Sequence, residues 1–277
     1  MINPTQTPRI DHLGLIAGRG VYPLLTARAA RAAGVARLSV IAVDADTDPV
    51  LSSLADEFVS LRVGQLGKLL AFCKEKGIAH AVMAGQVAPG NLFDLKPDLK
   101  ALVVLATLKE RNAETIFGAI ADELAKVGTT LLPATAFLED ALAPAGHFAG
   151  PAPGRRGWDD AEFGFRIAKE SSRLDIGQSI VVKKGTVLAV EAFEGTDKAM
   201  RRGGELGRGG ATLVKVSKPD QDFRFDVPVI GPQTLRTARE AGIAAIACEA
   251  GRTLLLDRAE VVRLAGEYKI AMAGLPR

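Results

Sequence analysis

The sequence predicts an α/β protein whose N-terminal domain is a doubly wound parallel sheet and whose C-terminal domain is mixed α/β. Apolar runs of strand length alternate with segments of helical period along the chain. Aromatic residues make up only 5% of the 277 residues, so aliphatic side chains must fill the interior, as they do in parallel sheets covered on both faces. The length also exceeds the usual size of one domain, roughly 100 to 200 residues, so two domains are expected.

The first half of the chain alternates between strand and helix. A strand from His12 leads through a glycine-bearing turn into a helix that runs toward Gly34. The apolar run from Leu38 to Asp46 predicts a second strand, and the segments LGKLLAFCKEKG and AHAVMAGQV predict a helix and a strand. Helical periodicity then extends from Pro97 to Gly128, a glycine suited to a helix C-terminus. This rhythm is typical of a doubly wound sheet.

Pro and Gly accumulate between residues 144 and 157, and the periodicity disappears there. We therefore expect a linker at 144–157 between domains that span 1–143 and 158–277. A helix from Asp159 or Asp160 to near Gly177 opens the second domain, followed by two strands joined at the turn Lys184-Gly185. A strand (ATLVKVSK), a helix (PQTLRTAREAG), a strand (in IAAIACEAGRTLLLD) and a last helix (AEVVRLAGEYK) complete it.

Composition excludes several classes of protein. Apolar residues are 48% and charged residues 24% of the chain, which indicates a folded globular protein. The net charge of +3 is small and aromatic stacking surfaces are scarce, so no nucleic-acid partner is expected. No apolar stretch reaches the roughly 18 residues of a membrane span and no signal peptide is evident, which predicts a cytoplasmic protein. Cys73 and Cys248 lack metal-ligand spacing and are predicted to be buried thiols.

Two glycine turns follow predicted strands. The turn IAGRGVYP carries Gly18, Arg19 and Gly20, where backbone N–H groups at a helix start can approach a phosphate. It completes neither a G-x-G-x-x-G fingerprint nor a P-loop, so a tight structural turn is an equally good interpretation. AGQV, with Gln86, is a second turn at a strand end, where open α/β sheets bind ligands. Together they predict a nucleotide cleft with these four residues as substrate-binding candidates.

The segment from Val190 to Gly210 combines acids, a hydroxyl and cations. Glu191 and Asp197 offer the carboxylate oxygens that Mg²⁺ prefers, and Thr196 can cap the helix that follows. Gln178, in DIGQS, adds an amide at a helix-to-strand turn. The alternative is a capped helix with a solvated charged face. No G-x-S-x-G motif occurs and no two histidines have ligand spacing, which counts against a serine hydrolase and a histidine metal site.

The string LVKVSKPDQDFRFDVPVIGPQT places five charged candidates within twelve positions. We expect Asp222, Arg224 and Asp226 to point to one side of an extended segment, with Lys215 and Lys218 before them. The prolines after Asp226 would hold its carboxylate in place. An exposed edge strand whose charges discourage pairing is the competing interpretation. We favour a functional site.

These motifs resemble a known family. DIGQSIVVKKGTVLAVEAFEGTD, LVKVSKPDQDFRFDVPVIGPQT and AGIAAIACEAGRTLLLD look like the UDP-2,3-diacylglucosamine hydrolase family of the LpxI type, as do LGLIAGRGVYP and AGQV. The likeness covers essentially the whole chain. It implies an N-terminal Rossmann-like parallel sheet domain and a C-terminal domain of its own kind, with substrate held between them, and a homodimer.

The resemblance also implies an activity. A member hydrolyses the diphosphate of UDP-2,3-diacylglucosamine to UMP and 2,3-diacylglucosamine 1-phosphate (lipid X) in lipid A biosynthesis, with Mg²⁺ as cofactor and water attacking the α-phosphorus. The acyl chains of the substrate imply an apolar groove and peripheral contact with the surface of the inner membrane.

Carried over residue by residue, the aspartate of the family's D-x-P stretch falls on Asp226, which is expected to bind magnesium or position water. The remaining candidates fall into three groups. They are Asp222 and Lys218 as catalytic partners, Glu191 and Asp197 as metal ligands beside Asp226, and Gln178, Thr196, Lys215 and Arg224 as substrate-binding residues.

Two other functions remain open. A Rossmann-type nucleotide-sugar transferase or oxidoreductase fits the β/α alternation, although the incomplete glycine fingerprint counts against a dehydrogenase. A non-catalytic nucleotide or lipid carrier fits the same scaffold. Loss of turnover with retained substrate binding after substitution of Asp226 would separate a hydrolase from a carrier.

Overall fold

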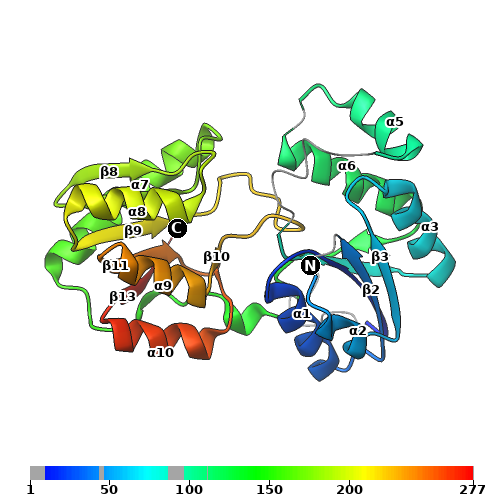
Figure 1. Ribbon diagram of the computed structural model, residues 1–277, viewed down its shortest axis with the longest axis horizontal. Coiled ribbons are helices and arrows are strands. Elements are labelled where there is room, and N and C mark those ends of the chain that lie inside the picture. Colours follow the sequence, from blue (N-terminus) through cyan, green and yellow to red (C-terminus); the bar gives the residue numbers. More distant parts are fainter. Residues whose placement is uncertain (1–9, 44–46, 87–96, 111, 277) are drawn as a thin grey trace, which may run out of the picture. The chain divides into compact units, whose positions relative to one another are not determined.

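The computed structural model describes residues 10–43, 47–86, 97–110 and 112–276, and it divides into two compact units (Figure 1). The first unit comprises the chain up to Leu138 together with Asp222–Asp226. The second comprises Glu139–Gln221 and Val227 to the end. Each unit has its own sheet and its own apolar core.

The first unit contains a five-stranded sheet in the order β3-β2-β1-β4-β5, and every pairing in it is parallel. This confirms the predicted Rossmann-like parallel sheet. The strand order reverses between β1 and β4, and ligands of such sheets bind at the carboxyl ends of the strands at this switch point. The strands are β1 (His12–Ala17), β2 (Arg37–Val43), β3 (Glu57–Leu61), β4 (His80–Ala84) and β5 (Thr130–Leu131).

The helices of the first unit begin and end at residues that suit those positions. Asp98 caps α5 by accepting from the N–H of Ala101, and Asn112 caps α6 by accepting from the N–H of Thr115. The segment 97–128, predicted to be helical throughout, therefore forms two separate helices. The helices are α1 (Tyr22–Ala32), α2 (Val50–Leu54), α3 (Leu66–Lys76), α5 (Leu99–Thr107) and α6 (Ala113–Lys126).

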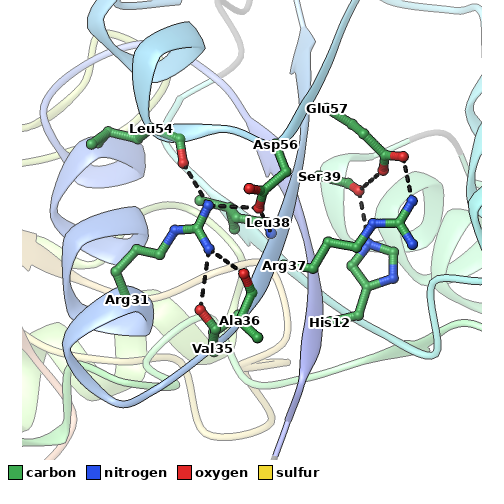
Figure 2. A network of polar contacts seen from close by, with 10 residues as sticks. All are labelled: His12, Arg31, Val35, Ala36, Arg37, Leu38, Ser39, Leu54, Asp56 and Glu57. Atoms are coloured by element: carbon green, nitrogen blue, oxygen red, sulfur yellow. Dashed lines mark hydrogen bonds and ion pairs between the residues drawn. The ribbon is translucent and has the colours of Figure 1, made fainter.

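Polar side chains tie the amino ends of β1, β2 and β3 together (Figure 2). His12 Nε2 lies 2.8 Å from Ser39 Oγ, and the Ser39 hydroxyl donates to Glu57 Oε2 at 2.5 Å. The hydrogen bond from Ser39, followed by that from Arg37, lowers the pKa of Glu57. His12 is the first residue of β1, where the predicted strand begins. The network lies at the strand end opposite the ligand-binding edge, so it fastens the sheet.

The second unit contains a six-stranded mixed sheet in the order β6-β13-β11-β9-β7-β8. Strands β9, β11 and β13 are parallel to one another, whereas β6 and β7 are antiparallel to their neighbours. The predicted hairpin is confirmed: β7 and β8 pair across Lys184 and Gly185, both with positive φ. The strands are β6 (Gly146–Ala149), β7 (Ser179–Lys183), β8 (Thr186–Val190), β9 (Ala211–Lys215), β11 (Ile243–Glu249) and β13 (Ala271–Leu275).

Helices cover both faces of this sheet. Alternate residues of β9 enter separate cores: Leu213 packs with α8, α9 and α10, whereas Val214 packs with α7. A Cβ at Gly164 would lie 2.7 Å from Val214 Cγ2, and one at Gly203 2.5 Å from Val181 Cβ, so glycine lets both helices approach the sheet. The helices are α7 (Arg155–Arg173), α8 (Thr196–Gly207), α9 (Pro232–Glu240) and α10 (Arg258–Tyr268), with a 3₁₀ turn at Glu139–Ala141 and a small parallel pair, β10 (Val229–Ile230) and β12 (Leu254–Leu255).

Residues 144–157, where the Gly and Pro content predicts a linker, include regular secondary structure. They contain β6, which pairs with β13 more than 120 residues later in the sequence, and the start of α7. Helix α7 begins at Arg155, earlier than the predicted Asp159 or Asp160. Both cysteines are buried as predicted, and burial raises the pKa of Cys73 to about 11 and of Cys248 to about 12. In the part of the chain described here, none of the helices has the length and apolarity that crossing a bilayer requires.

Candidate functional site

Polar side chains gather where the parallel strands of the second unit end. Lys215 is the last residue of β9 and pairs with Ser179, the first residue of antiparallel β7. Glu191 follows β8, and its N–H donates to the Ser179 carbonyl at 2.9 Å. Because α/β sheets bind ligands at the carboxyl ends of their parallel strands, this edge is a candidate site.

Three of the predicted residues form a chain of hydrogen bonds at this edge. The Thr196 hydroxyl donates to Glu191 Oε1 at 2.8 Å, and Lys215 Nζ donates to Thr196 Oγ1 at 3.2 Å. Thr196 is also the first residue of α8, whose free N–H groups and dipole favour anions. The edge therefore carries a cation and a helix start suited to phosphate oxygens, next to a carboxylate.

Buried polar atoms at this edge have hydrogen-bonding capacity that the described residues do not use. Glu191 Oε2 and Gln178 Oε1 are buried without a partner among those residues, as is Gln221 Nε2. Folded proteins leave few buried polar atoms unsatisfied, and those that occur often mark functional sites. The two oxygens suit a bound cation or a ligand that carries hydrogen-bond donors.

Glu249, at the end of β11, is the centre of a buried ionic cluster that the sequence prediction missed. Its side chain is 0% exposed, and it accepts hydrogen bonds from Lys169 Nζ at 2.6 Å and from the Ser217 N–H at 2.8 Å and hydroxyl at 2.7 Å. Burial alone would raise the pKa of Glu249, but the hydrogen bonds from Lys169 and Ser217 together outweigh burial and lower it. The sequence signal that could have identified Glu249 is its position as an acid directly after the apolar run IAAIAC.

Lys218 lies at the same edge but is already paired. Its ammonium group binds Asp175, and its backbone N–H donates to Gln221 Oε1 at 2.7 Å. Neither Asp222 nor Asp226, its predicted catalytic partners, belongs to the same unit. Within the second unit, the structure brings Lys218 to Asp175.

The segment that carries the predicted catalytic aspartates is a turn, not the extended strand that the alternation of charges predicts. The Asp226 N–H donates to the Asp222 carbonyl at 3.0 Å, which closes one helical turn. The Asp222 carboxylate accepts from the Arg224 N–H at 3.0 Å and from the guanidinium at 2.6 Å, and the latter bond lowers the pKa of Asp222. A short acid that bonds its own backbone two residues on favours a turn over a strand, which explains the correction.

This turn packs on the first unit at the carboxyl edge of its sheet. The N–H of Ala134, which follows β5, donates to the Phe223 carbonyl at 2.7 Å, and the Ala134 carbonyl accepts from the hydroxyl of Tyr22, at the start of α1. The Phe225 ring stacks on Phe117 of α6 with centroids 5.6 Å apart. Among the described residues, none bonds to the Asp226 carboxylate.

The two glycine turns of the first unit pack against each other. The Gly18 N–H donates to the Ala84 carbonyl at 2.8 Å, while Arg19 and Gln86 exchange backbone hydrogen bonds of 2.8 and 3.1 Å. A Cβ on Gly18 would lie 2.6 Å from the Gln86 carbonyl oxygen, so glycine is required for this contact. The N–H groups of Gly18 and Arg19 are thus engaged, whereas among the described residues the N–H of Gly20 has no backbone partner.

The predicted metal ligands are divided between the units. Glu191 and Asp197 lie at the edge of the second unit, and Asp226 lies in the first. Within residues 10–43, 47–86, 97–110 and 112–276, no three His, Cys, Asp or Glu side chains group closely enough to hold a metal ion.

Comparison with known proteins decides the family. The model of the LpxI N-terminal domain matches residues 12–141, and the model of the LpxI C-terminal domain matches residues 144–273. The chain belongs to the LpxI family. Among its relatives is the UDP-2,3-diacylglucosamine pyrophosphatase LpxI of Caulobacter vibrioides, which is 34% identical over 274 residues, or 95% of this chain and 97% of the relative.

Both the glycine turns and the second-unit edge therefore lie within LpxI domains, which confirms the resemblance seen in the sequence. A solved structure, that of gox2253, aligns with 93% of this chain and 82% of its own at 10% identity. Its TM-score of 0.31 is too low to support any argument.

Proposed function

We propose that this protein hydrolyses UDP-2,3-diacylglucosamine to UMP and 2,3-diacylglucosamine 1-phosphate, as a step of lipid A biosynthesis. The proposal is supported by one observation above all: in a chain of the LpxI family, Glu191, Thr196 and Lys215 form a hydrogen-bonded chain at the carboxyl edge of the second sheet. That arrangement offers positive charge for a diphosphate and a buried carboxylate beside it.

Magnesium is part of the proposal, and it is supported by free carboxylate oxygen in the second unit. Glu191 Oε2 is a buried carboxylate oxygen without a partner among the described residues, and Asp197 lies in the first turn of the adjacent helix. These two would hold the ion in the second unit. When bound, Mg²⁺ neutralises diphosphate charge and lowers the pKa of a coordinated water.

The remaining roles belong to side chains of the protein. Lys215 and the N-terminus of α8 stabilise the charge that grows on phosphoryl oxygens. Asp226 orients the water that attacks the α-phosphorus and accepts its proton. Asp222 holds Arg224 through paired hydrogen bonds, so the guanidinium is oriented before it meets a phosphate.

The acyl chains require apolar surface, and both units expose some. Phe193, two residues after Glu191, is 85% exposed, and Ile176 lies in the neighbouring loop. In the first unit, α5 exposes Leu99, Leu102 and Val103 at helical spacing. We infer that such side chains meet acyl chains at the inner-membrane surface, where a cytoplasmic enzyme acts peripherally, and that the protein forms the homodimer expected from the family.

The test is release of UMP from UDP-2,3-diacylglucosamine by wild-type protein and by Asp226→Ala, with and without EDTA. The proposal expects release by the wild type that requires Mg²⁺ and that the substitution abolishes. Release that survives the chelator would overturn the magnesium part alone. Substrate binding without release from the wild type would replace the hydrolase with a carrier.

A further inference from the structure

Five residues of the chain leave the second unit and pack on the first. Asp222–Asp226 belong to the first unit, whereas Gln221 and Val227 on either side belong to the second. The side chains of both flanking residues are buried, each with 8% exposure. The excursion is thus a single turn with both ends fixed.

Besides the attraction between Arg224 and Asp122 of α6, contacts of Phe223 and Phe225 hold this turn on the first unit. One is the backbone hydrogen bond from Ala134 to Phe223, which fixes the chain at a single point. The other is the Phe225 ring, which stacks on Phe117 at an interplanar angle of 29° and packs against the apolar core of the unit. An aromatic pair of this kind adds a preferred geometry to the burial of apolar area. The ring is therefore the larger of the two anchors.

Asp226 follows Phe225 directly, and its own side chain contributes nothing to its placement. Among the described residues, no donor bonds to its carboxylate. Its backbone N–H donates to the Asp222 carbonyl at 3.0 Å, within the turn itself. The position of the carboxylate on the first unit thus depends on how firmly the turn is docked, and the neighbouring ring supplies the docking.

We propose that Phe225 is a positioning residue: stacked on Phe117, it holds the turn Asp222–Asp226 on the first unit and so fixes the Asp226 carboxylate at the carboxyl edge of that sheet. The proposal rests on the proposed function in taking Asp226 as the catalytic carboxylate. A turn without its anchor samples many positions, and a displacement of about 1 Å can lower a rate roughly a hundredfold. Lys215 and Thr196 lie outside the turn and are unchanged, whereas Arg224 moves with Asp226, so KM also rises but kcat falls by the larger factor.

The kinetic test uses both halves of the stack. Phe225→Ala and Phe117→Ala are each expected to lower kcat roughly tenfold to a hundredfold, with a smaller rise in KM because Arg224 moves with the turn. The double variant should lose no more than either single one, because both remove one contact. Phe72→Ala is the matched control, since Phe72 of α3 is a partly buried phenylalanine packed against the same core. It should lower the melting temperature and leave kcat intact.

A structural readout accompanies the kinetics. Trypsin cuts after Arg224, between the two aromatic residues of the turn, and a docked turn resists cleavage. In Phe225→Ala, well below the melting temperature, cleavage into 1–224 and 225–277 should be at least tenfold faster than in wild type and in Phe72→Ala. Phe225→Leu, which keeps apolar contact without a ring face, should recover part of kcat.

An unchanged kcat in Phe225→Ala would overturn the proposal, as would an equal loss in Phe72→Ala or an unchanged rate of cleavage at Arg224. If wild-type protein releases no UMP, the proposed function fails on its own. In that case faster cleavage in Phe225→Ala still supports Phe225 as the anchor of the turn, and equal cleavage still overturns it.

Discussion

Thr196 donates its hydroxyl hydrogen to Glu191 at 2.8 Å, and this bond joins the first residue of α8 to the carboxylate that follows β8. The same hydroxyl oxygen accepts from Lys215. One small side chain therefore bridges a buried acid and a cation. This arrangement leaves the second carboxylate oxygen, Glu191 Oε2, for another partner.

Replacement of Thr196 by Val tests that arrangement. The variant keeps the shape of the side chain but removes a donor to Glu191 and an acceptor for Lys215, and an unsatisfied buried group costs about 1–3 kcal/mol. We expect kcat/KM for UMP release to fall roughly tenfold to a hundredfold. Thr186→Val, at an exposed position in β8, is the control and should match wild type. Equal activity of both variants would contradict the role of Thr196.

Glu191→Gln tests the metal assignment. The amide is nearly isosteric but carries no charge, so the site should hold Mg²⁺ more weakly. We expect the Mg²⁺ concentration for half-maximal activity to rise at least tenfold. Glu194→Gln alters a carboxylate of the same loop that pairs with Arg202 at the surface, and its magnesium titration should equal that of wild type. A wild-type titration for Glu191→Gln would place the metal ligands elsewhere.

Lys169→Met tests the buried cluster around Glu249. Removing one partner of a buried ion pair costs about 3–5 kcal/mol, which should appear in the free energy of unfolding at pH 7 measured with urea. Lys198→Met, an exposed lysine of α8, should change that energy little. A loss below about 0.5 kcal/mol for Lys169→Met would show that Ser217 and Arg252 satisfy Glu249 without it.

The same cluster predicts a pH dependence. The pKa of Glu249 is lower in the folded protein than its usual value of about 4.3, so its contribution to stability is complete above that value and is lost as the pH falls through the folded pKa. In Lys169→Met, the hydrogen bond from Lys169 no longer counteracts the effect of burial, so the pKa of Glu249 should rise. The stability difference between the variant and wild type should therefore narrow between pH 7 and pH 5. A difference that stays constant over this range would contradict the assignment.

Gly18→Ala tests the contact between the two glycine turns. A methyl group 2.6 Å from the Gln86 carbonyl oxygen meets backbone that cannot give way cheaply, and overpacking of this kind costs about 1–3 kcal/mol. We expect a lower melting temperature. Gly118→Ala is a useful contrast: Gly118 lies inside α6 with no atom within 4 Å of a new Cβ, so alanine should stabilise the helix. Equal stability of the two variants would show that the turns separate easily.

The sequence predicted elements whose signal is local. The strand at His12, the hairpin turn at Lys184-Gly185 and the helix from Pro232 were found from apolar period, turn chemistry and proline position. The strands β6 and β13 were missed. Strand β6 has four residues in a stretch rich in Gly and Pro and pairs with a partner more than 120 residues later, and β13 is a short run after the last predicted helix. Strand β3 is an edge strand with alternating exposure, and its few apolar residues gave too weak a signal.

The candidate site was also predicted only in part, because residue type is visible in the sequence whereas pairing between distant residues is not. Glu191, Thr196 and Lys215 were singled out by residue type, and the sheet brings them together. The predicted extended arrangement of Asp222 and Arg224 was wrong. Their alternating charges were interpreted as a strand with a period of two, whereas the two side chains pair with each other within a turn. Glu249 was not placed in the site, because only the packing of α7 reveals that Lys169 reaches it.

The path of the chain through Asp222–Asp226 also determines what happens when the two units are expressed as separate fragments. A gene fragment that ends at Leu138 would encode the first sheet but not the turn that completes its carboxyl edge. A fragment that starts at Glu139 would carry that turn with no surface to receive it. If the turn positions the catalytic carboxylate as proposed, the two halves expressed separately are expected to be inactive even where each folds, and activity is expected to return when they are mixed and Phe225 stacks on Phe117.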